Sequence, residues 1–139
     1  MKRNRKYICL VFTMFFVMSM VMTAYAATAD VAYDDFAVTL PSYSGDTEVS
    51  TVAKSSSLSY FIIIPETESQ ATQVRAWAES DTWGTNYSDP YKVVTLNKST
   101  NVYYYASTYP VKGEYVVLNL DNPVYTTEMP YITGEWTPN

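Results

Sequence analysis

Apolar and polar residues alternate along most of the chain beyond residue 35, which is the pattern of strands that bury one face. Turn residues separate the alternating runs at the short, regular spacing typical of a β-sandwich. No window shows helical periodicity of useful length. We therefore expect an all-β fold, a single antiparallel β-sandwich of seven to eight strands over residues 36–139. The predicted strands are 36–40, 47–54, 58–64, 72–79, 91–96, 102–107, 115–120 and 131–136.

Two features of this pattern predict how strands are placed. Residues 58–64 are apolar at successive positions and end at Pro65, so this run is predicted to be a central strand, or a strand whose outer face meets a partner. The runs 91–96 and 102–107 are separated by polar residues and are predicted to form a β-hairpin.

The first 26 residues have a different composition from the rest of the chain. A positive head (Lys2, Arg3, Arg5 and Lys6) precedes an apolar run at 8–22, and Ala24-Tyr25-Ala26 follows it. This order predicts a secretory signal peptide, residues 1–26, cleaved after Ala26; an uncleaved anchor helix is the alternative. An acidic segment, residues 27–35, then leads into the sandwich. We expect an extracellular protein of Gram-positive-type export that meets the membrane only through its signal peptide.

Composition narrows the chemistry further. The chain has no histidine and one cysteine, Cys9, which lies in the predicted signal peptide. Metal centres, Cys/His or Ser/His catalysis and disulfides are therefore not expected, and no cofactor is predicted. Removing residues 1–26 removes four basic residues and no acidic one, so the net charge of −5 becomes −9. Such a surface repels nucleic acid phosphates. We expect a non-catalytic monomer that binds no nucleic acid.

Aromatic side chains form the most conspicuous candidate site. Trp83, Tyr87 and Tyr91 fall in a long connection at residues 80–91, with Trp77 just before it and Tyr104 on a following strand. Flat rings beside polar groups stack on sugars or grip an apolar partner. These five residues are the predicted binding residues, and burial in the core is the alternative reading, the favoured one for Trp77 and an equal one for Trp83.

Acidic residues offer two weaker alternatives. Asp81, Asn86 and Asp89 could supply oxygen ligands to calcium, but their spacing matches no known calcium loop, and solvated acids explain them better. Paired carboxylates for glycoside cleavage would need a cleft that the sequence does not indicate. The terminal Gly134-Glu135-Trp136 is interpreted structurally, with the glycine relieving a bend and the tryptophan closing the sandwich.

Several short motifs resemble a group of small secreted β-sandwich proteins of Gram-positive Firmicutes, which has no assigned activity. They are Leu40-Pro41, Lys54-Ser55-Ser56, Arg75-Ala76-Trp77-Ala78 and Thr133-Gly134-Glu135-Trp136-Thr137-Pro138. A fainter similarity, through residues 83–88 and 102–105, is to lactococcin-type bacteriocins, which act on wall synthesis through the lipid-linked precursor. The histidine and glycine content typical of that group is missing, and no functional residue is carried over from it.

Two functions follow as hypotheses. The first is a secreted, non-catalytic sandwich that binds a cell-wall glycan, a wall precursor or a surface protein, with bacteriocin-like antagonism as one form. The second is a structural or accessory exported protein whose apolar strand at 60–64 pairs edge to edge with a partner or a second copy.

Overall fold

The structure is a computed structural model that describes residues 32–43, 45–67 and 71–139. These residues contain no helix and form eight strands. This confirms the all-β prediction and agrees with the larger of the two predicted numbers of strands, seven or eight. The predicted signal peptide 1–26 and most of the acidic segment 27–35 lie outside the described residues. The strands are β1 (Asp34–Thr39), β2 (Thr47–Ala53), β3 (Tyr60–Glu66), β4 (Gln73–Ser80), β5 (Val93–Thr95), β6 (Thr100–Tyr103), β7 (Tyr115–Asp121) and β8 (Tyr131–Thr137).

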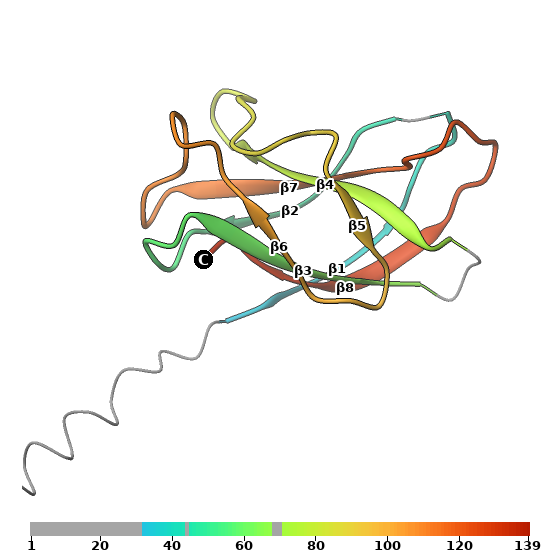
Figure 1. Cartoon of the computed structure of the whole chain (residues 1–139), viewed down its shortest axis with the longest axis horizontal. Helices are drawn as coiled ribbons and strands as arrows, with labels where there is room; N and C mark the ends of the chain where they lie inside the picture. The colour runs from blue at the N-terminus through green and yellow to red at the C-terminus, as the bar shows by residue number, and fades with distance from the viewer. Residues whose placement is uncertain (1–31, 44, 68–70) are drawn as a thin grey trace, which may run out of the picture. The chain divides into compact units, whose positions relative to one another are not determined.

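The strands form two four-stranded antiparallel sheets that lie one over the other (Figure 1). One sheet has the order β1-β8-β3-β6 and the other has the order β2-β7-β4-β5. Strand β1 pairs with β8, β2 with β7, β3 with β6 and β4 with β5, as in one long hairpin whose tip is β4–β5. Rolling this hairpin brings β3 against β8 and β4 against β7. The arrangement is that of a jelly roll.

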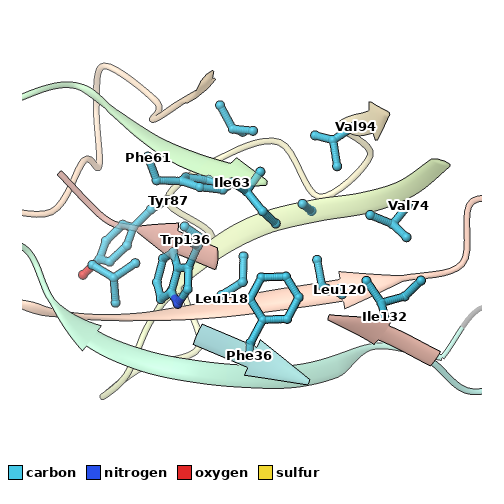
Figure 2. Packing of buried hydrophobic residues seen from close by; sticks show 14 of the residues in the cluster. Phe36, Phe61, Ile63, Val74, Tyr87, Val94, Leu118, Leu120, Ile132 and Trp136 are labelled. Carbon is cyan, nitrogen blue, oxygen red and sulfur yellow. The ribbon is translucent and has the colours of Figure 1, made fainter. Parts of the chain in front are cut away.

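The core lies between the two sheets and takes alternate residues from the inner strands (Figure 2). Phe61 and Ile63 come from β3, Leu118 and Leu120 from β7, and all four are fully buried. Trp136 of β8 meets the Phe61 ring edge to face at 6.1 Å between centroids. Complete burial of each such side chain contributes roughly 1.5–3 kcal/mol, so these contacts dominate the stability of a domain that contains no described disulfide.

The prediction of a central strand at 58–64 is confirmed. Strand β3 pairs with β6 through Tyr60–Ile63 and with β8 through Ile62–Glu66. Strand β3 continues through Pro65, where the sequence predicted that it would end. Proline is tolerated at this position because the pairing with β6 has already ended at Ile63, so no strand on the β6 side requires the amide hydrogen that proline lacks. The Pro65 carbonyl instead accepts a hydrogen bond from the amide of Asn97 at 2.6 Å.

The predicted hairpin of 91–96 with 102–107 is wrong, because β5 and β6 belong to different sheets. The amide of Leu96 bonds to the Thr72 carbonyl beside β4, whereas the next amide, of Asn97, bonds to the Pro65 carbonyl of β3. A single step of the chain thus crosses from one sheet to the other, with Asn97 at a φ of 58°. On either side of the crossing, Val94 of β5 and Val102 of β6 are buried in the core.

Candidate functional site

A tight turn after β4 places Trp83 at the tip of a projecting loop. The Gly84 amide bonds to the Ser80 carbonyl at 3.1 Å, and the Ser80 amide bonds back to the Thr85 carbonyl at 2.9 Å. Gly84 has a φ of 59°, a conformation that glycine adopts without strain. Trp83 is 81% exposed at this tip. The turn therefore fixes a large flat ring in solvent.

The chain then returns along β4 and joins the two sheets. The Tyr87 amide bonds to the Ala78 carbonyl at 2.8 Å, and the Ser88 hydroxyl accepts from the Ala78 amide at 2.9 Å. On its other side this segment meets the connection after β6, where the Tyr105 amide bonds to the Tyr87 carbonyl at 2.7 Å. Two connections that are distant in the sequence are thereby held side by side by main-chain hydrogen bonds.

A shallow, open hollow of about 310 Å³, called here the aromatic groove, lies between these two connections. This volume is at the lower end of the range of ligand pockets, roughly 300–1,000 Å³. Two aromatic rings, a buried tyrosine, three hydroxyl side chains and one carboxylate line it. The lining residues are Ser80, Trp83, Thr85, Tyr87, Thr108, Tyr109 and Glu114.

Glu114 is the only charged residue among those that line the groove. One of its carboxylate oxygens accepts from the Tyr87 hydroxyl, and the other accepts from the Val111 amide at 3.0 Å. Burial raises the pKa of the Tyr87 phenol, and its hydrogen bond to Glu114 and that carboxylate's charge raise it further, against a smaller lowering by Ser80. The phenol thus remains a neutral donor that orients Glu114. Both carboxylate oxygens keep unused lone pairs.

The predicted binding residues divide between the groove and other places. Trp83 and Tyr87 line the groove, although the Tyr87 ring is buried and only its hydroxyl end serves the site. Tyr91 is 74% exposed but does not line the groove, and its ring lies 5.7 Å from the guanidinium of Arg75.

The other two predicted residues are buried, so neither presents a ring to a ligand. Trp77 is 2% exposed on the outer side of β4, where its indole nitrogen donates to Glu79 at 2.7 Å. Tyr104 lies in the core, and its hydroxyl donates to the Pro138 carbonyl at 2.7 Å. For these two residues the alternative reading of burial applies.

Sequence reasoning included Ser80 and Thr85 only as part of the connection at 80–91, and it did not name Thr108 or Glu114 as partners of Trp83. Both of these residues lie in the connection between β6 and β7, so no local spacing along the chain relates them to Trp83. The sequence signal closest to Glu114 is the pair Lys112-Gly113, which is typical of a turn, and Gly113 has a φ of 90° in the structure.

Further hollows occur among the described residues. One of about 260 Å³ lies at the opposite end, between the start of β4 and residues 122–130. Another of about 230 Å³ lies beside Gly134 and includes Asp35, Glu66 and Glu135. No group of three or more acidic, histidine or cysteine side chains suited to a metal ion occurs within the described ranges. None of the described residues belongs to a helix that is long and apolar enough to cross a membrane.

Comparisons of the chain with protein-family models, with curated proteins and with solved structures find no match. The resemblance to secreted Firmicute proteins and to bacteriocins therefore stays a prediction. The function has to be inferred from the chemistry of the aromatic groove.

Proposed function

We propose that the protein is an exported, non-catalytic saccharide-binding domain that uses the aromatic groove to hold a glycan of the bacterial cell wall. The observation that carries the proposal is Trp83, which is 81% exposed at a hydrogen-bonded turn and lines the aromatic groove beside hydroxyl groups and one carboxylate. Burying an aromatic ring of this size would remove 150–250 Å² from water, worth several kcal/mol at about 25 cal/mol/Å². A ligand that covers the exposed Trp83 ring would therefore gain binding free energy from removing that ring from water.

The remaining lining residues suit a sugar. A pyranose has one apolar face of C–H groups that packs against a flat ring, and hydroxyl groups at its edge. Thr85 and Thr108 can donate to and accept from those hydroxyls, while Glu114 accepts. Cleavage is not proposed because Glu114 is the single carboxylate that lines the groove, whereas glycoside hydrolysis commonly uses two.

Export and location belong to the same proposal. The predicted signal peptide at 1–26 would deliver the domain to the outer face of the cell, where wall glycan is the abundant saccharide. Killing of competing cells is a narrower form of the hypothesis. Inhibition of growth by the purified protein would support that form, and unchanged growth would leave binding alone.

The experiment is retention of the purified protein on insoluble peptidoglycan. We expect Trp83→Ala to weaken retention by at least about tenfold, the loss typical of a central tryptophan in a binding site, without a change in melting temperature. Tyr91→Ala is the matched control, because Tyr91 is also largely exposed in the same connection but does not line the groove. Equal retention of Trp83→Ala and wild type, or equal loss in both variants, would contradict the proposal.

Pairing through a sheet edge has less support. Strand β3, the predicted pairing strand, pairs with β6 through Tyr60–Ile63 and with β8 through Ile62–Glu66, so a ladder already occupies one side of each of its residues and both sides of its middle. The true edges discourage pairing: β5 and β6 are short, β2 has a bulge between Glu48 and Ser50, and β1 begins with two aspartates. Sedimentation that stays monomeric at high concentration is the expected result, and concentration-dependent association would revive the alternative.

A further inference from the structure

The charge of Glu114 lacks a cationic partner in the groove. The only ion pair among the described residues joins Arg75 to Asp121 at 3.1 Å, away from this site. Glu114 is partly buried, and its two hydrogen-bond donors, the Tyr87 phenol and the Val111 amide, are both neutral. A partly desolvated carboxylate without a counter-charge attracts a cation more strongly than one in bulk water.

Aromatic rings around the same hollow reinforce this preference. Trp83 and Tyr109 line the groove together with Glu114, and both rings are partly or largely exposed. The negative face of an aromatic ring attracts an ammonium group, and a carboxylate forms a charge-assisted hydrogen bond with it. An anionic group would instead meet Glu114 and the acidic surface of a chain with a net charge of −5.

We propose that the groove selects saccharides that carry a free, protonated amino group over the same saccharides with that group acetylated. The inference rests on the proposed function and adds the chemical class of the sugar. The ammonium group binds beside the Glu114 carboxylate, and the sugar ring packs against Trp83.

The test compares two oligosaccharides of equal length that differ only in acetylation, glucosamine oligomers and N-acetylglucosamine oligomers. Binding is measured by calorimetry at pH 6, where the amine is protonated. We expect the glucosamine oligomer to bind at least about tenfold more tightly, with a preference that shrinks as salt rises. Equal affinities, or tighter binding of the acetylated oligomer, would overturn the inference.

Glu114→Gln ties the preference to this carboxylate. Glutamine can still accept from the Val111 amide and donate to the Tyr87 oxygen, so the turn has the hydrogen bonds that it needs. The variant should bind both oligomers alike, whereas Glu48→Gln, which removes one negative charge on exposed β2, should keep the preference. A preference that survives in Glu114→Gln would overturn the assignment to Glu114.

The outcomes separate this inference from the proposed function. Wall retention that depends on Trp83, together with equal binding of both oligomers, would leave the function standing and overturn the amino-group selectivity. If the wild-type protein neither stays on the cell wall nor binds either oligomer, the proposed function and the amino-group selectivity are both overturned. If Glu114→Gln fails to fold, the comparison of the two oligomers on the wild-type protein still decides the selectivity.

Discussion

Lys54 is the most unusual single residue of the domain. It is only 1% exposed, and its ammonium group donates to the carbonyl of Leu58 and, at 3.1 Å, to that of Pro138. The same group lies 4.9 Å from the centre of the Tyr104 ring. Burial lowers its pKa from 10.5 to about 8. Lys54 therefore joins the β2–β3 connection to the last residues of the chain. Its charged form is disfavoured, because burial removes water from the ammonium group.

The stability of the domain should depend on pH because of Lys54. Between pH 8 and pH 10.5 the unfolded chain keeps the lysine proton that the folded protein has released. Unfolding therefore takes up a proton in this window, and stability rises with pH, by up to about 3 kcal/mol. Above pH 10 the trend reverses, because burial raises the pKa values of Tyr87 and Tyr104 and the unfolded phenols ionise first. Urea unfolding at several pH values should show maximum stability near pH 9–10.

Lys54→Met provides the control for this prediction. Methionine fills a similar volume without a titrating group, so the rise in stability above pH 8 should disappear while the decline above pH 10 remains. A variant that shows the same rise as wild type would assign the effect to another group.

Strand β8 shows why one residue type is required within an element. A Cβ atom at Gly134 would lie 2.3 Å from the Ile64 carbonyl oxygen and 2.9 Å from the Phe36 ring. The glycine therefore permits β8 to lie close against β3 and β1, a more specific role than relieving a bend. Trp136, two residues further along, is fully buried, in agreement with its predicted closing position.

Gly134→Ala should lower the free energy of unfolding by at least about 3 kcal/mol, since a main-chain oxygen cannot move aside as a side chain can. Gly84→Ala is the comparison. Both glycines have positive φ, 153° at Gly134 and 59° at Gly84, but a Cβ atom at Gly84 would meet no atom within 4 Å, so only the conformational cost of about 1–2 kcal/mol remains. Chemical denaturation of both variants measures the difference. Equal losses of unfolding free energy in the two variants would show that glycine is needed at position 134 for its positive φ, and not for the close approach of Ile64 and Phe36.

At the scale of elements, the sequence predicted where strands lie but not how they pair. Alternation of apolar residues reports which face is buried, so each predicted run overlaps one of the eight strands, although the run 102–107 shares only residues 102 and 103 with β6. It does not report the neighbour, because β5 and β6 bury the same kind of face whether they pair together or in separate sheets. The pairing depends on the crossing at Leu96 and Asn97, where two consecutive amides bond to different sheets.

At the scale of the whole molecule, the aromatic groove arises from the rolled topology. Trp83 follows β4, whereas Tyr109 and Glu114 precede β7, and the strand arrangement brings these connections to one end. The sequence indicated an aromatic contact surface around Trp83 but placed Trp77 and Tyr104 in it. Composition cannot separate a buried ring from an exposed one when both lie in or beside strands.

The most direct test of the proposal that the aromatic groove binds a saccharide uses the three tryptophan indole signals in a ¹H–¹⁵N spectrum. Trp83 is exposed in the groove, while Trp77 and Trp136 are buried elsewhere and act as internal references. Titration with soluble saccharide fragments of purified peptidoglycan should shift the Trp83 signal in a saturable manner and leave the other two unchanged. Binding that leaves the Trp83 signal unshifted, or that instead shifts the amide signals of residues 122–130 at the opposite end of the domain, would contradict the account.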